Sequence, residues 1–364
     1  MKKVLAIVLA LVLVLALAAC GGSGGGDAPA PAPAPTPAAT PDAAPAGDPS
    51  EVYTLKLHSH DPAPSPSGLF LKAWSEDIMA ASGGRLVIDV YYGATLGGPR
   101  DTLEMIENGT CDIGWGLPSF FPGVFPCAEV LMLPMTGLGT AKQASQIMWD
   151  LYESSPAMQA EFSKYKVLLL HANTQSPISS RNMQFETVDD LRGKNIRGNG
   201  GPPTDFITAM GAAPVGVPIT ELFEAINNGT IDAVITDWSA IDAFQLFETC
   251  KYYADVDIGP SNYFLMMNWD SYNNLPADLQ QIIDDRSGWA ALEYCGTEWD
   301  ESDARVRQEI ANRGDVIYKL DPAEQAKLQA IADGVVDAWV EAKEAAGLPG
   351  QELVDALKAG LSKY

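Results

Sequence analysis

The sequence predicts an α/β fold made of two similar domains with a cleft between them. Segments with strand periodicity alternate with segments with helix periodicity, which is typical of α/β folds with largely parallel sheets. A short segment also occurs twice, as EMIENGTCD at 104–112 and as EAINNGTID at 224–232. Each copy follows a Gly-x-Pro sequence and is typical of a helix that ends at a glycine and leads into a strand. Two such units indicate two related domains.

The individual elements follow from local periodicity and from helix-ending residues. In the first part of the chain we expect a strand at 52–57, a helix around 69–78 that ends at Gly83-Gly84, a strand at 86–91, a helix at 101–108 and a strand at 112–115. Further along we expect a buried strand at 167–170, a strand that ends at Arg197, a helix that opens at Pro276, helical periodicity to about Arg313, a strand at 316–320 and two closing helices.

The first 20 residues combine a charged start, an apolar run and a final cysteine. Lys2 and Lys3 precede an uncharged apolar run at 4–17, and the segment ends in Leu-Ala-Ala-Cys at Cys20. This tetrapeptide resembles the bacterial lipobox, so we expect a signal peptide at 1–19 that is cleaved before a lipidated Cys20. An uncleaved transmembrane helix is the alternative, but the apolar run is shorter than the roughly 20 residues that a span needs.

Residues 20–50 are rich in Gly, Ala and Pro. Repeated proline favours an extended polyproline II conformation, and such a segment has little apolar surface to bury. We therefore expect a disordered spacer. A proline-rich ligand for a partner protein is the alternative, but the repeat lacks aromatic or basic specificity residues.

Charge and cysteine content restrict the classes of partner. The net charge of −24 argues against nucleic acid and against docking on anionic lipid headgroups. Four further cysteines have spacings that fit neither a zinc site nor a dense disulfide framework, so buried thiols and a disulfide bridge both remain open; they are Cys111, Cys127, Cys250 and Cys295.

The chain shows no visible catalytic constellation. HExxH, Walker and GxGxxG patterns are absent from the sequence, so we expect no enzyme activity, no cofactor and no catalytic residue. His58 and His60 alternate on one face of the first strand, which is compatible with a metal site. Because no third ligand is evident nearby, we favour hydrogen bonding by His60 at the rim of the cleft and expect no metal.

A series of short motifs in a defined order resembles one family of transport proteins. The markers are Gly83-Gly84-Arg85, Leu96-Gly97, Gly109-Thr110-Cys111-Asp112, Phe125-Pro126, Leu133-Pro134, VDDLRGKNIR at 188–197, MGAAPV at 210–215, Glu221-Leu222-Phe223, Gly229-Thr230-Ile231-Asp232 and Leu275-Pro276. From about Tyr53 to Gly347 the chain resembles the solute-binding proteins of tripartite ATP-independent periplasmic (TRAP) transporters, the DctP-like family.

The resemblance implies a two-domain periplasmic-binding-protein clamp (type II-like) with chain crossovers and a long helix that spans both domains. It implies domain I at 51–173 plus about 262–297, and domain II at 174–261 plus about 298–364. Such a protein is extracytoplasmic, here lipid-anchored to the cell membrane or in the periplasm. It passes a small organic acid to TRAP membrane permease subunits driven by an ion gradient.

Arg197 is the main candidate for ligand binding. Its planar guanidinium matches a carboxylate with two parallel hydrogen bonds. It precedes a glycine-rich loop that contains Asn199, and it matches the ligand-binding arginine of the family. A surface or structural ion pair is the alternative. The second arginine that the family often has is replaced by Ser176, and Arg181 is out of register, which argues against a dicarboxylate or a sugar acid.

Two tryptophans follow the two copies of the repeat. Trp115 and Trp238, the latter next to Asp237, could enclose an apolar or aromatic ligand body, although core packing is the alternative for each. Phe120, Phe121 and Phe264 are weaker candidates for the same wall, and Asn199, Ser176 and Asp237 are further candidates for ligand binding.

The sequence therefore predicts capture of a small carboxylate, in particular a monocarboxylate with an apolar or aromatic body. Two other functions share the clamp architecture. One is substrate binding for an ATP-driven (ABC) importer, and the other is ligand presentation to a sensory receptor.

Overall fold

A computed structural model describes residues 50–364 of the chain. The predicted signal peptide, the lipidated Cys20 and the spacer up to residue 49 lie outside the described residues. Among the helices of the described part, none combines the length and the apolar character that crossing a bilayer requires.

Within residues 50–364 the strands form two separate sheets. The first sheet has the order β2-β1-β3-β10-β4, with β1 Tyr53–His58, β2 Leu86–Tyr91, β3 Ile113–Gly116, β4 Lys166–Ala172 and β10 Asn262–Met267. The second has the order β11-β9-β5-β8-β6-β7, with β5 Ser176–Ser180, β6 Asn195–Arg197, β7 Ala213–Val215, β8 Ala233–Ile235, β9 Tyr252–Ile258 and β11 Val316–Tyr318.

The sheets are mixed rather than largely parallel, which corrects the sequence prediction. Five of the nine strand pairings in the described residues are parallel. The antiparallel pairings all involve β10 in the first sheet or β5 in the second. These two strands come directly after the chain has crossed from the other sheet, at 173–175 and 259–261, so each enters its new sheet in the opposite direction.

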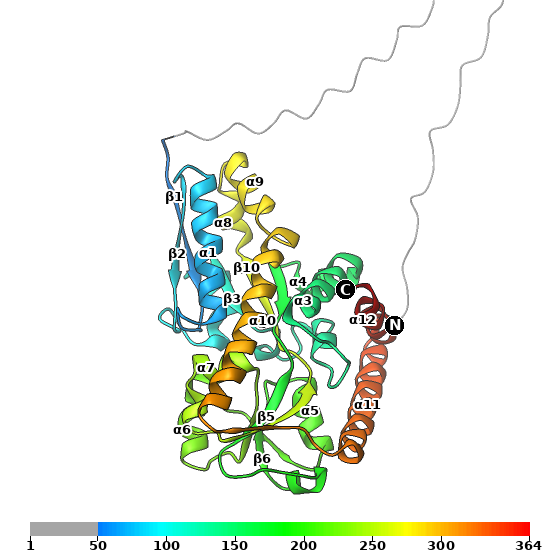
Figure 1. Cartoon of the computed structure of the whole chain (residues 1–364). Helices are drawn as coiled ribbons and strands as arrows, with labels where there is room; N and C mark the ends of the chain where they lie inside the picture. The colour runs from blue at the N-terminus through cyan, green and yellow to red at the C-terminus, as the bar shows by residue number, and fades with distance from the viewer. Residues whose placement is uncertain (1–49) are drawn as a thin grey trace, which may run out of the picture. The chain divides into compact units, whose positions relative to one another are not determined.

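Each sheet has its own helices, and we call a sheet with these helices a lobe (Figure 1). The first lobe contains α1 Pro66–Ala81, α2 Thr102–Glu107, α3 Ala141–Ser154, α4 Pro156–Phe162, α8 Trp269–Asn273 and α9 Ala277–Asp285. The second contains α5 Pro202–Ala209, α6 Leu222–Asn227 and α7 Trp238–Ala243. Short 3₁₀ turns lie at 99–101, 118–120, 128–132, 188–191, 219–221 and 246–248.

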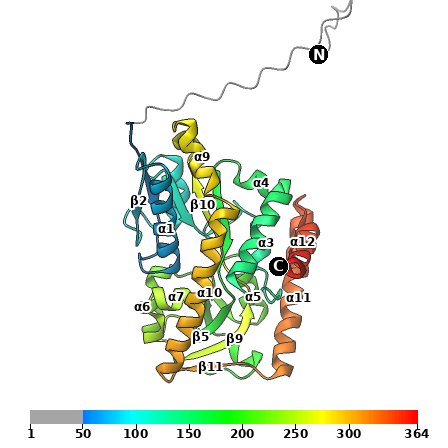
Figure 2. The same cartoon turned by 45° about the horizontal axis from the view of Figure 1, so that its top comes forward.

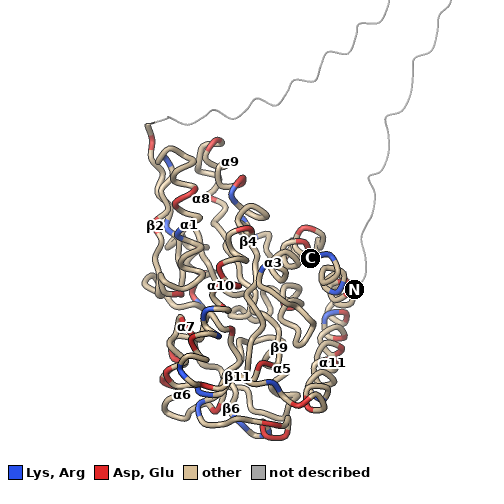
Figure 3. Tube along the Cα trace, viewed as in Figure 1, with Lys and Arg blue, Asp and Glu red and all other residues tan. Residues whose placement is uncertain are grey.

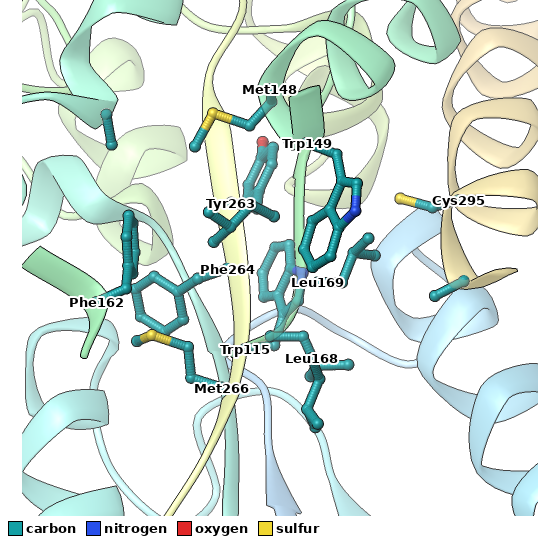
Figure 4. Close-up of a cluster of buried hydrophobic side chains, with 14 of the residues drawn as sticks. Trp115, Met148, Trp149, Phe162, Leu168, Leu169, Tyr263, Phe264, Met266 and Cys295 are labelled. Atoms are coloured by element: carbon teal, nitrogen blue, oxygen red, sulfur yellow. The ribbon is translucent and has the colours of Figure 1, made fainter. Parts of the chain in front are cut away.

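The second sheet has a hydrophobic core on each face, because successive side chains of a strand point to opposite faces. Ala233 and Ile235 of β8 join the core under α5, while Val234 between them joins the core under α6 and α7. The first lobe has one large core in which aromatic rings and methionines from β3, β10 and α3 meet leucines from β4 (Figure 4).

Two long helices connect the lobes (Figure 2). The start of α10 (Trp289–Asn312) packs in the first-lobe core through Leu292 and Trp299, and its end packs in the second lobe through Val306 and Ile310. The resemblance predicted such a helix. A second one, α11 (Pro322–Ala345), was not predicted, and it places Leu328 in the second lobe and Trp339 in the first.

The last helix, α12 (Gly350–Lys363), packs on α3 and contributes Leu353, Val354 and Leu357 to the first-lobe core. The domain boundaries expected from the resemblance, with 298–364 assigned to the second domain, stay a prediction.

The repeated segment folds into the same unit in both lobes. In the first copy α2 is followed by Gly109 with φ +75° and then by β3, and in the second α6 is followed by Gly229 with φ +70° and then by β8. Asp112 Oδ2 accepts a hydrogen bond from Lys56 N at 2.7 Å, and Asp232 Oδ2 accepts one from Asn195 N at 2.8 Å. The equivalent aspartates thus fix two strands of their sheets in the same way.

Candidate functional site between the two sheets

A pocket with about 440 Å³ of empty space lies where parallel strands of both sheets end. The segments that follow β1 and β3 contribute its first-lobe side, and the segments that follow β6 and β8 contribute its second-lobe side. Ligands of open α/β sheets generally bind at the carboxyl ends of parallel strands. The polar side chains that line it are His60, Asp61, Ser65, Ser67, Arg197, Asn199, Thr236, Asp237, Ser239 and Tyr263.

Arg197, the last residue of β6, is held in place by its neighbours. Its side chain lines the pocket although the residue is only 2% exposed. Its Nε donates a hydrogen bond to Val217 O at 3.2 Å, and its Nη1 donates one to Asn199 Oδ1. Because a guanidinium carries five N–H groups, three remain for a ligand.

The charge of Arg197 has no carboxylate partner within salt-bridge distance among the described residues. Burial lowers the pKa of Arg197 to about 10, while the more distant charge of Asp237 opposes this effect. The guanidinium therefore stays charged at neutral pH. A buried cation without an adjacent anion is costly, so a bound anion would be stabilising here.

Asn199 links Arg197 to a crossing segment of the chain. Its Nδ2 donates to Ser261 Oγ at 2.7 Å, and Ser261 N in turn donates to Asn173 Oδ1 at 2.7 Å. Asn173 Nδ2 donates to the hydroxyl of Tyr263, also at 2.7 Å. The candidate ligand contact is therefore connected by hydrogen bonds to both segments that cross between the lobes.

The first-lobe side of the pocket carries His60 and Asp61. Burial lowers the pKa of His60 to about 3, so its ring is neutral. Burial raises the pKa of Asp61 to about 6, an effect that the hydrogen bond from Ser67 Oγ to Asp61 Oδ2, 2.6 Å long, partly opposes. Polar groups thus face the pocket from both lobes.

Apolar side chains line much of the remaining pocket surface. The first lobe contributes Leu117, Phe120 and Trp299, and the second lobe contributes Ile219 and Phe244. A wider cleft of about 1230 Å³ adjoins the pocket and shares Arg197, Asn199, Phe120 and Ile219 with it. This mix of apolar walls and few polar groups is typical of small-molecule sites.

Four of the predicted site residues line this pocket and four do not. Arg197, Asn199, Asp237 and His60 line it. Trp115, Trp238, Ser176 and Phe264 are at most 2% exposed and are not among its lining residues.

The two tryptophans pack in the cores, so this structure does not place them as the walls of a ligand sandwich. Trp115 stacks on Tyr263 with ring centroids 4.8 Å apart, and its Nε1 donates to His171 Nε2 at 3.0 Å. Trp238 lies under the guanidinium of Arg307, 4.0 Å from its ring centroid. Trp115 therefore supports a pocket residue from behind.

Three further expectations concern residues outside the pocket lining. Arg181 is exposed and donates to the carbonyl of Asn227, away from the pocket. The cysteines at 111, 127, 250 and 295 are free and buried. Among residues 50–364, no group of three or more His, Cys, Asp or Glu side chains is arranged to hold a metal ion.

Sequence reasoning missed several residues of the site. Asp61 directly follows His60, which was expected to form hydrogen bonds at the rim of the cleft, but no separate role was predicted for Asp61. Tyr263 and Trp299 had no local signal, because they come from a crossing strand and from the middle of α10. Arg100 lines the wider cleft, and its charge contributes to the lowered pKa of Arg197.

Two lobes joined by crossing segments, with a buried cation between them, define a two-lobed ligand-binding protein of the periplasmic type. Residues 58–343 match the family described as bacterial extracellular solute-binding protein, family 7 (DctP). The match covers most of the chain, and the chain belongs to this family. It is therefore a solute-binding protein of the TRAP transporter type, a family of transport proteins rather than enzymes.

Curated relatives share modest sequence identity with the chain. The outer membrane transporter protein TsaT of Comamonas testosteroni is 26% identical over 296 residues, covering 80% of this chain and 86% of its own length. The ectoine-binding periplasmic protein TeaA of Halomonas elongata is 23% identical over 281 residues, covering 75% of this chain and 80% of its own length.

Solved structures share the fold. A TRAP solute-binding protein from Rhodoferax ferrireducens, in complex with copurified benzoate, has a TM-score of 0.81 and 28% identity, covering 86% of this chain and 98% of its own. One from a marine metagenome, specific for aromatic acid ligands and bound to 3-hydroxybenzoate, has a TM-score of 0.82 and 28% identity, with coverages of 86% and 99%.

Proposed function

We propose that this protein captures a monocarboxylate with an apolar or aromatic body and delivers it to the membrane subunits of a TRAP transporter. Arg197 carries the proposal. It is a buried, charged fork with three free N–H groups, and it lies in a pocket between the lobes. It binds the ligand carboxylate with parallel hydrogen bonds. Asn199 orients the guanidinium, while Asp237 and His60 contribute polar contacts from the two sides.

The rest of the pocket supports an apolar ligand body. Phe120, Phe244 and Trp299 give it aromatic surface, and Leu117 and Ile219 give it aliphatic surface. Ser176 stands where the family often has a second arginine, so the pocket lacks that second cation for a dicarboxylate. The aromatic acids bound by the Rhodoferax and marine proteins are of the same chemical class as the proposed ligand.

Closure of the two lobes around the ligand provides the affinity. In the closed pocket the ion pair of Arg197 with the carboxylate is shielded from water, which strengthens it. Ligand binding then shifts the population of the protein toward the closed arrangement, by an amount equal to the difference in affinity between the two arrangements. The closed, loaded protein is the form that the permease receives.

We further propose that a lipid on Cys20 holds the protein at a membrane and that residues 20–50 are its spacer. The tether raises the concentration of the protein near the permease. Replacing Cys20 with Ser is expected to move the protein from the membrane fraction to the soluble fraction of cells. Retention of the C20S variant in the membrane fraction would argue against lipidation at this residue.

A thermal-shift screen of organic acids tests the proposed function. The soluble form that begins at Ser50 would be heated with aromatic and aliphatic monocarboxylates, with dicarboxylates and with sugar acids. Because a ligand that binds only the folded state stabilises it by RT ln(1 + [L]/Kd), a tight acid raises the melting temperature. We expect the largest increase for a monocarboxylate with an apolar body. A screen in which dicarboxylates or sugar acids give the largest increase, or no acid gives any, would refute the proposal.

A further inference from the structure

Two carboxyl groups face the pocket that we propose to bind a carboxylate. Asp237, on the second-lobe side, is 3% exposed, and the side chain of Asp61, on the first-lobe side, is 15% exposed. A ligand carboxylate adds a third negative group, while Arg197 is the one arginine or lysine among the described residues that line this pocket. Like charges in a closed pocket repel one another, so at least one of the acids needs a partner that the ligand supplies.

Asp237 has local partners within its own lobe. Its Oδ1 accepts hydrogen bonds from Ser239 Oγ and from Ala240 N at the start of α7. It also faces the cation of Arg197, whose pKa its charge raises. Asp237 therefore acts as the N-cap of α7, and its negative charge also favours the charged form of Arg197.

Asp61 has fewer partners. Its Oδ2 accepts one hydrogen bond from Ser67 Oγ, but its Oδ1 accepts none from a described residue. The nearest cationic candidate is His60, whose Nε2 is 3.5 Å from Asp61 Oδ1. Burial lowers the pKa of that histidine to about 3, so it gives no charge at neutral pH. A carboxylate oxygen that lines the pocket is thus available to accept a hydrogen bond.

We infer that the natural ligand carries an O–H or N–H donor on its body, in addition to the carboxylate, and that Asp61 accepts the hydrogen bond from this donor. The ligand class is then a hydroxy- or amino-substituted monocarboxylate. The inference rests on the proposed function. Arg197 and Asp61 come from opposite lobes, so one ligand with a group at each end joins the lobes when they close.

Specificity arises because a site built to accept a hydrogen bond discriminates against a ligand that lacks the donor. A methyl group in place of the hydroxyl gives Asp61 Oδ1 no hydrogen bond from the ligand. We expect the binding free energy lost with this hydrogen bond to be larger than the binding free energy gained by burying one methyl group.

The test compares matched pairs of ligands by calorimetric titration of the form that begins at Ser50. Each hydroxybenzoate (ortho, meta and para) is compared with the methylbenzoate of the same position, and 3-(aminomethyl)benzoate provides a cationic donor. In the native protein we expect at least one donor ligand to bind about 10-fold more tightly than its methyl partner. If a hydroxybenzoate binds more tightly than 3-(aminomethyl)benzoate, the donor on the ligand is an O–H group. If 3-(aminomethyl)benzoate binds more tightly, the donor is an N–H group.

The Asp61→Asn variant tests the role of the residue. We expect the preference for the donor ligand to fall to about 3-fold or less, because the amide makes a weaker, uncharged hydrogen bond. The affinity for the methyl partner is expected to rise, because a negative charge has been removed from the pocket. Asp257→Asn is the matched control, since Asp257 lies on a different pocket, and it is expected to keep both values.

The outcomes separate this inference from the proposed function. If benzoates bind the native protein but no donor ligand exceeds its methyl partner, the inference fails while the proposed function stands, whether or not the Asp61→Asn variant folds. An unchanged preference in the folded Asp61→Asn variant also overturns it. If no monocarboxylate binds at all, both the proposed function and the inference fail.

Discussion

At the residue scale, the site depends on charged side chains that are buried without a directly adjacent opposite charge. Arg197 and Asp61 each lose hydration on folding, and each keeps hydrogen bonds that fix its orientation. Such groups reduce the stability of the protein before ligand binds, because burial disfavours their charged forms. We propose that the same groups then bind a ligand that supplies a carboxylate to Arg197 and a hydrogen-bond donor to Asp61.

The stability of the protein is expected to depend on pH through Asp61. Burial raises the pKa of its carboxyl to about 6, above the ordinary value of 3.8. Above pH 6 the folded protein holds an ionised, buried carboxylate, which costs stability; at about pH 4 and below the cost disappears, because both states are protonated. The Asp61→Asn variant removes this cost. It is therefore expected to be more stable than the native protein above pH 6, by at most about 3 kcal/mol.

Urea unfolding of both proteins at several pH values measures this difference. The stability advantage of the Asp61→Asn variant should stay near its full value from about pH 8 to about pH 7 and then shrink as the pH falls from about 6 to about 4. Burial lowers the pKa of His58 to about 4 and those of His60 and His171 to about 3, so these rings stay neutral in both folded proteins over most of this range. A stability difference that stays constant over this range would show that Asp61 has an ordinary pKa.

Single residues of the site could be predicted from sequence only where a motif or a resemblance marked them. Arg197 was marked by both, and it lines the pocket. Trp115 and Trp238 were chosen because they follow equivalent strands, but the direction of a side chain depends on packing. In the structure Tyr263 covers Trp115 with a stacked ring, and Arg307 covers Trp238.

At the element scale, local periodicity was a good guide to the strands and helices but not to the direction of strand pairing. The strands at 86–91 and the strand end at Arg197 lie where the pattern placed them. β5 and β10 pair antiparallel with their neighbours because the chain changes lobes just before each of these strands. Such a crossing depends on contacts between residues that are far apart in sequence. No pattern within β5 or β10 indicates it.

The repeated segment was the most informative element signal. It predicted a helix, a glycine and a strand in each lobe, and both copies have this order. The sequence did not reveal the reason for the two aspartates that end the copies. Asp112 and Asp232 each accept a backbone hydrogen bond from a neighbouring strand, so they fix the register of that strand.

At the scale of the whole molecule, four segments within residues 50–364 connect the lobes. The chain crosses at 173–175 and at 259–261, and α10 and α11 each pack in cores of both lobes. Four connections restrict the relative motion of the lobes more than a single linker does, so we expect opening and closing as a hinge-type motion with a defined path. The pocket that contains Arg197 lies between the lobes.

Acidic and basic residues occur along the chain in both lobes (Figure 3). With a net charge of −24, the molecule as a whole repels small anions. Screening by salt limits this repulsion to about 8 Å at physiological ionic strength. We therefore expect the buried cation of Arg197, rather than the net charge, to determine whether an organic acid binds.

The central claim is that Arg197 holds the ligand carboxylate, and a binding titration of two arginine variants tests it most directly. The tightest monocarboxylate for the native protein is titrated into Arg197→Ala and into Arg181→Ala, an exposed arginine of the same lobe that lies outside the pocket. We predict that Arg197→Ala weakens binding at least about 100-fold, since it removes a charged bidentate contact, and that Arg181→Ala changes it less than about 3-fold. Binding by a folded Arg197→Ala variant with native affinity would contradict the account.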